Sequence, residues 1–482
     1  MSATDAEKAR FVRDLAKELR EENLAIFAGA GLSVPAGFVN WGELLKPIAE
    51  DLDLDVEREA ADLISLAQYH CNVNGGNRSK LNQLLIDQFC KDVTLTENHK
   101  ILARLPINTY WTTNYDSLIE TALSDTGKVP DIKYTKTQLV YTKRKRDAIV
   151  YKMHGDANHP SEAVLTKDDY EKYHVDMQPF LGALTGDLIS KAFLFLGFSF
   201  TDPNLDYILS RVRISFSKDQ RQHNCILRTV KREAEESEAD FDYRKRKQKL
   251  FVQDLKRFGI KTLLVDEYSN ITDILHELER LYRRKTVFIS GAAHEYAPYD
   301  KDKACQFVYE ISKDIAKSDF RIVSGFGLGI GSSVITGALD HAYMSDRGKA
   351  EDHLILRPFP QDHAHDGNLS ALWTNYRKDM IVHAGIAVFL FGNKLDGDQV
   401  RLSNGMREEF EIAKEEGLFL LPIGATGSMA KELWDEVSGS FDEYNGTHKE
   451  KIKEKFELLG TVGMDLDSIH EHTMAILNLL CE

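Results

Sequence analysis

Residues 24–33 read Leu24-Ala-Ile-Phe-Ala-Gly-Ala-Gly-Leu-Ser33, an apolar run that stops at a glycine-rich turn. Just before it, residues 5–22 place apolar side chains at helical spacing among charged neighbours, which predicts an amphipathic helix. The short apolar run is typical of a buried strand, and the glycines are typical of a tight connection. The segment therefore predicts a helix, a buried strand and a turn at the carboxyl end of that strand.

Three further stretches repeat this arrangement, in which an apolar run is followed by polar residues. They are Thr113-Asn-Tyr-Asp116, His154-Gly-Asp156 and Gly197-Phe-Ser199. In open α/β sheets, ligands bind outside the carboxyl ends of the strands. The four stretches together therefore predict a nucleotide pocket that contains an asparagine, an aspartate and a histidine.

Alternating strands and helices continue along the whole chain. Further strands of the first half are expected at residues 107–112, 148–153, 192–198, 225–227 and 262–265. After a helix at 271–283 the alternation begins again, with strands expected at 286–289, 321–323, 353–356, 386–391 and 418–422. This pattern predicts parallel, doubly wound sheets. The fold class is therefore α/β, with two Rossmann-like doubly wound parallel-sheet domains in tandem, over residues 1–283 and 284–482.

The composition excludes several classes of protein. With 482 residues, the chain is too long for one ordinary core, which agrees with two domains. The net charge of −15 argues against a general nucleic-acid binder, because phosphate affinity needs clustered Lys and Arg. The five cysteines include no C-x-x-C pair, so a disulfide framework or a zinc ribbon is not expected, and a reducing cytoplasm fits. The apolar runs are too short to span a bilayer, so no membrane association is expected.

The polar residues of the four stretches also have ordinary structural roles open to them. Ser33 can cap the helix that follows it, Asp116 can cap the next one, and Asn114 can close a turn. An isolated histidine such as His154 is more often a structural residue than a catalyst. The occurrence of all four stretches in one order favours a shared site over four separate structural roles.

Together, the four stretches resemble the NAD-binding motifs of the sirtuin family, over roughly residues 20–280. In that family the Gly-Ala-Gly turn and the Gly-x-Ser segment hold the dinucleotide. The Asn and Asp of the second motif lie near the nicotinamide ribose, and the His serves as a base. The resemblance implies catalytic roles for Asn114 and His154. It implies roles in binding NAD⁺ for Gly29, Ala30, Gly31, Ser33, Asp116, Gly197 and Ser199.

The sequence departs from the sirtuin deacylases in two ways. It lacks their four-cysteine zinc module, and no obvious insert is expected that would frame an acyl-lysine tunnel. Without that acceptor, water attack at C1′ of NAD⁺ is the most available reaction, and it gives ADP-ribose and nicotinamide. Asn114 can orient the water and the ribose hydroxyls, and His154 can accept a proton. Asp116 can hold the carboxamide or His154, and this chemistry requires no metal.

The second domain carries two glycine-rich turns, each after an expected strand. They are Ser290-Gly-Ala292 and Ser324-Gly-Phe-Gly-Leu-Gly-Ile-Gly331, and the second opens a helix expected at 332–344. Glycine-rich turns at helix N-termini are suited to phosphate. Four charged residues follow later in the chain, and they are Arg357, Arg377, Lys394 and Glu409. Each alone is typical of a surface charge, but gathered at one sheet edge they would suit a diphosphate and a ribose diol.

This half resembles the SLOG group of nucleotide-sensing Rossmann-like domains. A sirtuin-like domain followed by a SLOG domain resembles the NAD-cleaving effectors of bacterial Thoeris anti-phage systems. The motifs that carry this resemblance include Gly197-Phe-Ser-Phe-Thr-Asp-Pro-Asn-Leu-Asp-Tyr207 and Leu356-Arg-Pro-Phe-Pro360. The resemblance implies activation by a cyclic ADP-ribose isomer that a TIR-domain partner protein makes. It implies effector-binding roles for Ser290, Gly291, Gly327, Leu328, Arg377, Lys394 and Glu409.

The leading hypothesis is therefore a gated NAD⁺ glycohydrolase of the bacterial cytoplasm. An unregulated enzyme of this kind would deplete NAD⁺ in its own cell, so the resting state must be nearly inactive. Effector binding would favour the active state through subunit rearrangement in a homo-oligomer, a tetramer or larger. The alternatives are protein deacylation or ADP-ribosyl transfer on the same fold, and a catalytically silent NAD-binding scaffold that reports nucleotide levels.

Overall fold

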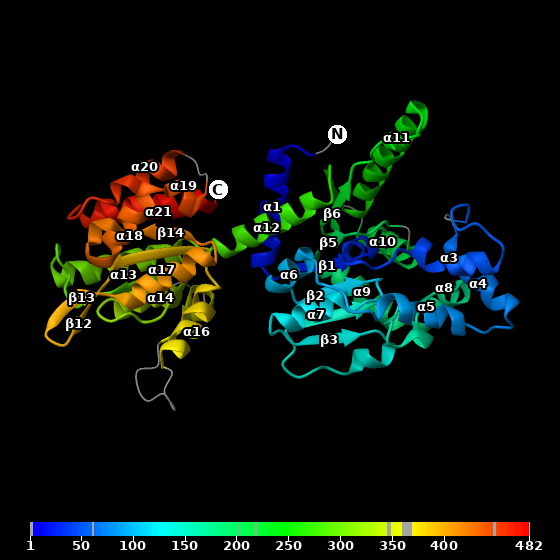
Figure 1. Cartoon of the computed structure of the whole chain (residues 1–482), viewed down its shortest axis with the longest axis horizontal. Helices are drawn as coiled ribbons and strands as arrows, with labels where there is room; N and C mark the ends of the chain where they lie inside the picture. Colours follow the sequence, from blue (N-terminus) through cyan, green and yellow to red (C-terminus); the bar gives the residue numbers. More distant parts are fainter. Residues whose placement is uncertain are drawn as a thin grey trace. The chain divides into compact units, whose positions relative to one another are not determined.

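The computed structural model describes residues 3–59, 62–200, 202–216, 219–344, 349–358, 369–446 and 450–481. Thr201, Phe359 and Pro360 of the motifs quoted above lie outside these residues. The chain forms two compact units, which divide between Glu279 and Arg280 (Figure 1). This division lies within helix α12 (Ser269–Arg283), a few residues before the boundary that the sequence places at 284.

The described part of the first unit is built on a seven-stranded sheet in which all neighbouring strands are parallel. The strands are β1 (Leu24–Ala28), β2 (Thr109–Thr112), β3 (Pro130–Lys133), β4 (Ala148–Lys152), β5 (Ala192–Leu196), β6 (His223–Arg228) and β7 (Ile260–Val265). Their order across the sheet is β3-β4-β2-β1-β5-β6-β7. Every residue of β1 and β5 is buried, which explains why these two strands are apolar throughout.

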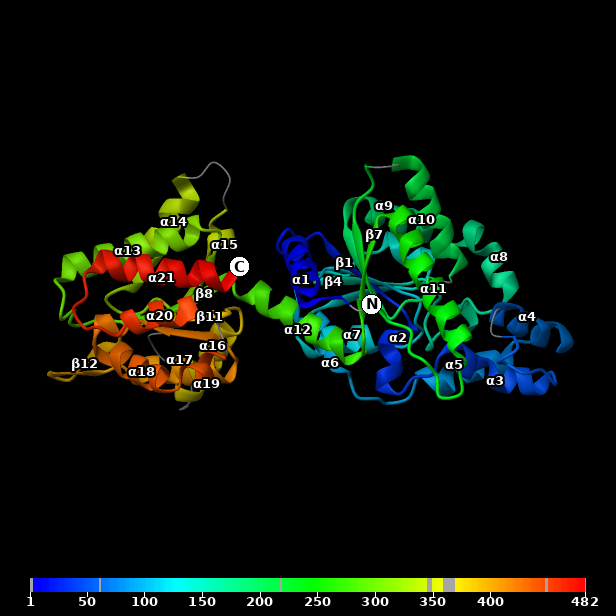
Figure 2. The ribbon, with the colours of Figure 1, turned by 90° about the horizontal axis from the view of Figure 1, so that it is seen from above.

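Helices cover both faces of this sheet. They are α1 (Asp5–Arg20), α2 (Ala30–Ser33), α3 (Trp41–Asp51), α4 (Leu63–Val73), α5 (Ser79–Phe89), α6 (Glu97–Arg104), α7 (Leu118–Asp125), α8 (Lys167–Asp176), α9 (Gln178–Ser190), α10 (Pro203–Phe216), α11 (Glu238–Leu255) and α12. Figure 2 shows α9 and α10 on one side of the sheet and α6 and α7 on the other. Beneath α9 and α10, the aromatic rings of Phe27, Trp111, Phe193 and Phe195 form the buried core.

Helices α3, α4 and α5 form an insertion between β1 and β2 with a small apolar core of its own. That core includes Leu45, Leu66 and Leu85, and it also contains Tyr115 and Ala157, which follow β2 and β4. The insertion therefore packs on the loops at the carboxyl edge of the sheet. This insertion was not foreseen from the sequence, and the expectation that no insert frames an acyl-lysine tunnel stays a prediction. The three helices are ordinary amphipathic helices, so no change in composition marks them as an insertion.

The described part of the second unit is built on a five-stranded sheet, which is again parallel throughout. The order is β10-β9-β8-β11-β14, with β8 (Thr286–Ala292), β9 (Arg321–Ser324), β10 (Leu354–Leu356), β11 (Ile386–Phe391) and β14 (Phe419–Pro422). A separate antiparallel hairpin joins β12 (Asn393–Asp396) and β13 (Gln399–Leu402). The predicted fold class, two doubly wound α/β domains in tandem, is confirmed.

Helices also cover both faces of the second sheet. They are α13 (Lys301–Lys317), α14 (Gly331–Met344), α15 (Ala350–His353), α16 (Leu369–Ile381), α17 (Asn404–Glu415), α18 (Ser428–Gly439), α19 (Phe441–Asn445), α20 (Glu450–Leu458) and α21 (Leu466–Cys481). Figure 2 shows α13, α14 and α21 on one face and α17 and α18 on the other. Within the described ranges of both units, no helix has the length and apolar composition needed to cross a membrane.

Candidate functional site

The four polar stretches of the first unit follow the carboxyl ends of four adjacent strands, and these ends lie level with one another across the sheet. In the parallel register, Ala28 of β1 lies opposite Thr112 of β2 and Leu196 of β5, and Thr112 lies opposite Lys152 of β4. Each stretch begins one or two residues after its strand ends. The structure therefore brings the stretches at 29–33, 113–116, 154–156 and 197–199 together at one edge of the sheet.

This edge is where the chain changes direction across the sheet. Strands β2, β4 and β3 lie on one side of β1, and β5, β6 and β7 lie on the other. The connections on the two sides of β1 therefore diverge, which opens a crevice at the carboxyl end of this strand. Such a switch point is the usual place for a ligand in a doubly wound sheet.

Three glycines let the first and fourth stretches touch backbone to backbone. A Cβ on Gly197 would lie 2.2 Å from the amide nitrogen of Leu32, and a Cβ on Gly29 would lie 2.5 Å from the carbonyl oxygen of Gly197. Gly197 also has a φ of +62°, in the left-handed region that favours glycine. The N–H groups of Gly29 and Gly31 donate to the carbonyls of Leu196 and Gly197, both at 2.9 Å.

These two N–H groups are therefore engaged within the protein. The predicted role of Gly29 and Gly31 in binding NAD⁺ stays a prediction, without these N–H groups as free donors. The glycines are instead required because the two turns pack too closely for side chains. Ala30 is the first residue of the short helix α2, and Ser199 is exposed.

Asn114 joins the second stretch to the first. Its Nδ2 donates to the carbonyl of Gly29 at 3.0 Å and to Oγ of Ser33 at 2.9 Å. The interpretation of Ser33 as a helix cap is wrong, because its side chain makes no capping hydrogen bond. The side chain of Asn114 does more than close its own turn, since it bonds to residues 81 and 85 positions away. Both amide hydrogens are used, so Oδ1 is the group that this side chain can offer to a ligand.

Asp116 divides its two carboxylate oxygens between two roles. Oδ1 accepts a hydrogen bond from the amide of Leu118 at 3.0 Å, in the first turn of α7, as the capping interpretation expects. Oδ2 is buried and has no hydrogen-bond partner among the described residues. Because a buried, unpartnered carboxylate oxygen is costly, Asp116 Oδ2 is a candidate acceptor for a ligand.

His154 is enclosed by aromatic rings and a carboxylate. It is only 3% exposed, and its ring centroid lies 5.4 Å from that of Tyr170 and 6.3 Å from that of Tyr115. Nε2 lies 2.9 Å from Oδ2 of Asp202, and this contact is an ion pair only when the ring is protonated. Neither ring nitrogen has a hydrogen bond of good geometry to another described residue. The imidazole can therefore bond to a ligand or a water beside the carboxylate of Asp202.

Asp202 is a candidate site residue that the sequence analysis did not assign. Burial raises its pKa, but the His154 ring and the backbone N–H groups of Leu205 and Asn204 outweigh burial, and the net direction is down. Asp202 is therefore ionised beside His154. Its Oδ1 also accepts from the amide of Leu205 at 2.9 Å. An Asp directly before Pro203 at a helix start is the one signal that could have identified it, and that signal suggests only a cap.

Another buried histidine, His99 of α6, lies close enough to Asp116 for the carboxylate to influence its pKa. Burial lowers its pKa to about 4 against the opposing influence of Asp116, so the ring is neutral at physiological pH. Nδ1 lies 2.7 Å from Oγ1 of Thr96, and Nε2 has no partner among the described residues. A lone histidine in an amphipathic helix gives no sequence signal of such a position.

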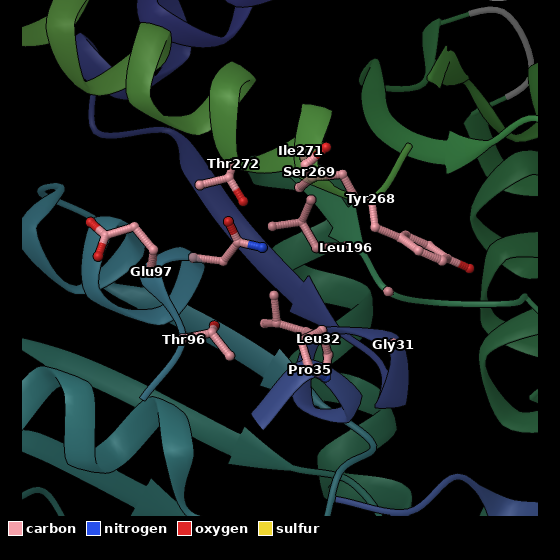
Figure 3. A pocket seen from close by; sticks show the side chains of 12 residues that line it. Gly31, Leu32, Pro35, Thr96, Glu97, Leu196, Tyr268, Ser269, Ile271 and Thr272 are labelled. Atoms are coloured by element: carbon pink, nitrogen blue, oxygen red, sulfur yellow. The ribbon is translucent and has the colours of Figure 1, made fainter. Parts of the chain in front are cut away.

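A cavity of about 200 Å³ adjoins the glycine turn. Figure 3 shows Gly31 and Leu32 on one side of it and the first residues of α12 on the other, with Thr96 and Glu97 at the start of α6 beside them. Asn114 and His154 are not in its lining, and their side chains are only 8% and 3% exposed. The cavity therefore reaches the turns that flank these two residues but stops short of them.

A larger pocket of about 380 Å³ lies at the carboxyl edge of the second sheet. It is lined by all seven residues to which the sequence assigned effector binding: Ser290, Gly291, Gly327, Leu328, Arg377, Lys394 and Glu409. Arg357 is not in this lining, and its Nε lies 3.7 Å from Asp379. Gly327 packs directly on the end of β8, because a Cβ there would overlap the carbonyl of Gly291 at 1.8 Å.

Charged side chains are paired at the base of this pocket. Ser290 Oγ donates to Oε2 of Glu409 at 2.5 Å, and Arg377 Nε lies 3.5 Å from the other oxygen of Glu409. Arg377 Nη1 also donates to Glu408 at 2.8 Å. Burial raises the pKa of Glu409, and Ser290 and Arg377 only partly offset this effect. Glu408 is a second residue that the sequence analysis missed, because adjacent glutamates give no signal of which one faces a pocket.

The chemistry available at these sites follows from the donors present. Among the described residues there is no group of three or more His, Cys, Asp or Glu side chains that could hold a metal ion. The first site offers an amide oxygen, an imidazole and two carboxylates, which suit a ribose, a carboxamide and a proton transfer. The second offers Arg377 and Lys394 for anionic groups and Glu409 for hydroxyl donors.

Comparisons with known proteins match both halves of the chain. Residues 108–252 match the model of the SIR2-like domain, and residues 270–480 match that of the Sir2- and TIR-associating SLOG family, called STALD. The chain is 53% identical to NAD(+) hydrolase ThsA of Bacillus cereus over 459 residues, which cover 95% of each chain. It is 49% identical to NAD(+) hydrolase ThsA of Acinetobacter baumannii, over 92% of this chain and 93% of the relative.

A more distant relative matches less than half of the chain. Defense-associated sirtuin 2 of Bacillus subtilis is 26% identical over 225 residues, which cover 45% of this chain and 22% of that protein. The near full-length identity to several NAD(+) hydrolases, with both domain matches in the same order, shows the family. The chain belongs to the ThsA family of NAD(+) hydrolases, with a SIR2-like domain followed by a SLOG domain of the STALD type.

Proposed function

We propose that this protein is an NAD⁺ glycohydrolase of the bacterial cytoplasm that cleaves NAD⁺ to ADP-ribose and nicotinamide when an effector binds its SLOG domain. The observation that carries the proposal is that Asn114 and His154 follow the ends of two adjacent strands in register, beside the packed turns at Gly29 and Gly197. Family membership supports NAD⁺ as the substrate.

The proposed reaction breaks the bond between C1′ of the ribose and the pyridinium nitrogen. As nicotinamide leaves, positive charge develops on the ribose, and the oxygens of Asn114 and Asp116 stabilise it electrostatically. Asn114 Oδ1 accepts a hydrogen bond from the attacking water or a ribose hydroxyl. His154 accepts the proton, and Asp202 at 2.9 Å stabilises the imidazolium that forms. Water supplies the hydroxyl of ADP-ribose, and its second proton goes to the imidazole.

The size of the cavity supports a gated enzyme. A cavity of about 200 Å³ is smaller than the roughly 300–1,000 Å³ that small-molecule sites occupy, and NAD⁺ is a large ligand. Asn114 and His154 are also nearly inaccessible to solvent. We propose that the site widens before the nicotinamide ribose reaches these two side chains, and that a bound effector that favours the wider state activates the enzyme.

We propose a cyclic ADP-ribose isomer as this effector. In the second pocket, Arg377 and Lys394 would hold its diphosphate and Glu409 a ribose diol, with the turns at Gly291 and Gly327 close to its backbone. The family description "Sir2- and TIR-associating" supports a TIR-domain protein as its source. A homo-oligomer, a tetramer or larger, would convert binding into widening of the first site. The protein would thereby act as an anti-phage effector that depletes NAD⁺.

The test is an assay of the purified chain with NAD⁺ and a panel of cyclic ADP-ribose isomers, each added alone. Nicotinamide and ADP-ribose are quantified by chromatography. We expect equal amounts of nicotinamide and ADP-ribose when one isomer is present, and almost no product when it is absent. Consumption of an acetyl-lysine peptide together with NAD⁺ would favour a deacylase. Binding of NAD⁺ and of an isomer without nicotinamide release would favour a silent scaffold.

A further inference from the structure

Lys152 is a buried lysine that the proposed mechanism does not use. It is the last residue of β4, two positions before His154, and it is 0% exposed. Its Nζ lies 2.6 Å from the carbonyl of Asp116, 3.2 Å from that of Tyr115 and 2.6 Å from Oδ2 of Asp156. A fourth oxygen, Oε1 of Glu120 in α7, lies at 2.9 Å. An ammonium group has three donors, so this environment uses all of them.

These contacts join the two loops that carry the proposed catalytic residues. Tyr115 and Asp116 directly follow Asn114 in the loop after β2, whereas Asp156 lies in the loop after β4, two residues beyond His154. The ammonium of Lys152 bonds to both loops at once. A neighbouring backbone bond supports the link, because the amide of Ala157 donates to the carbonyl of Tyr115 at 3.0 Å.

The charges around Lys152 keep it protonated in spite of its burial. Burial lowers its pKa, but Glu120 and Asp156 outweigh burial, and the net direction is up. Asp156 is itself held by two hydrogen bonds from Asn158, at 2.8 and 2.9 Å. A buried ion pair of this kind is often no more stabilising than apolar side chains of the same volume. What an apolar side chain cannot supply is the set of bonds to the two loops.

We propose that Lys152 is a positioning residue for NAD⁺ cleavage, whose ammonium holds the Asn114 loop and the His154 loop at their working separation. The inference rests on the proposed function, because it assigns the chemistry to Asn114 and His154. Loss of the ammonium would leave the turns at Gly31 and Gly197, which line the cavity, in place. It would therefore lower kcat and change KM little, since the lost interaction matters for the geometry of the reacting groups.

Three variants separate this role from a contribution to stability. Lys152→Met removes the ammonium and keeps the volume. Glu120→Gln removes a charge partner and leaves the bonds to the two loops. The double variant Lys152→Met/Glu120→Gln removes one positive and one negative charge, so the buried charge balance of the native chain is kept. For each full-length chain, kcat and KM for NAD⁺ are measured with the isomer that activates the native chain, together with the melting temperature.

The proposal expects Lys152→Met and the double variant to lose kcat by roughly 10²-fold, with KM within about threefold of the native value. Glu120→Gln should keep kcat within about threefold, and the double variant should melt closer to the native chain than Lys152→Met does. Native kcat in the double variant would overturn the proposal, and so would a kcat loss in Glu120→Gln equal to that in Lys152→Met. If Lys152→Met does not fold, the double variant decides. No nicotinamide release by the native chain with any isomer would instead refute the proposed function.

Discussion

Replacement of Gly197 by alanine tests the packing of the two turns that form the floor of the proposed NAD⁺ site. A Cβ at this position would lie 2.2 Å from the amide nitrogen of Leu32 and 2.5 Å from the carbonyl carbon of Gly31. Nonbonded contacts between heavy atoms are favourable at about 3.5–4.0 Å, so the turn at 29–33 would have to move by about 1 Å or more. The substitution therefore displaces the turn to which Asn114 is bonded.

The expected magnitude has two parts. An alanine at a φ of +62° costs about 1–2 kcal/mol, and overpacking costs about 1–3 kcal/mol more, so we expect a loss of about 2–5 kcal/mol in stability. A displacement of about 1 Å in the turn that holds Asn114 should lower kcat/KM for NAD⁺ by roughly 10²-fold. The assay is nicotinamide release at varied NAD⁺ concentration, with unfolding in urea measured on the same preparations.

Gly186→Ala in α9 is the matched control. A Cβ on Gly186 meets nothing within 4 Å, and the residue lies inside a helix, where alanine stabilises by about 0.5–1 kcal/mol relative to glycine. This variant should keep the native kcat/KM and unfold at a slightly higher urea concentration. If Gly197→Ala behaved like Gly186→Ala in both measurements, the close packing of the turns would not matter for function, and this reasoning would be refuted.

Three further predictions concern single side chains. Asp202→Asn should lower kcat by roughly 10²-fold or more, because the imidazolium of His154 that forms during the reaction is no longer stabilised by the carboxylate of Asp202. Folding lowers the pKa of Asp202 from its usual value of 3.8, so the ionised carboxylate stabilises the native chain above that pH. The native chain should therefore lose stability relative to Asp202→Asn as the pH falls below 3.8. Equal acid unfolding curves for the two chains would contradict the lowered pKa of Asp202. Glu408→Gln should raise the affinity for the activating isomer by about threefold to tenfold, as measured by calorimetry. The reason is that the half-exposed carboxylate of Glu408 no longer competes with a diphosphate for Arg377. An unchanged affinity would exclude this competition. Burial lowers the pKa of His223 to about 4, so this residue takes up a proton at higher pH in the unfolded chain than in the folded chain. The free energy of unfolding should therefore fall by up to about 3 kcal/mol between pH 6.5 and 4. In His223→Leu the same measurement should show a smaller fall.

The sequence predicts the central strands well because burial leaves them little freedom of composition. The bounds of β1 and β11 agree with the apolar runs at 24–28 and 386–391, and both strands are buried along their whole length. The edge strand β3 was not predicted, since Pro130-Asp-Ile-Lys133 has no apolar run and pairs on one side only. The hairpin of β12 and β13 was missed for the same reason, although Asp396-Gly397 is a typical turn signal.

The candidate sites show a similar division. Residues in contiguous motifs at strand ends could be predicted, because the register of a parallel sheet places those ends at one edge. No role was assigned from the sequence to Asp202, Lys152 or Glu408. The contacts of these side chains form only when the folded chain brings their partners near. Lys152, for example, reaches carbonyls 36 and 37 positions away. A lysine at the end of a strand has no pattern that distinguishes it from a surface charge.

The most direct test of the central claim is a structure of the activated protein with a non-hydrolysable analogue of NAD⁺. The measurement is the position of the C1′ atom of the nicotinamide ribose relative to the side chains of Asn114 and His154. We expect C1′ to lie between these two side chains, with the pyrophosphate beside the turns at Gly31 and Gly197. A nicotinamide ribose bound beside α12, beyond the reach of both side chains, would contradict it.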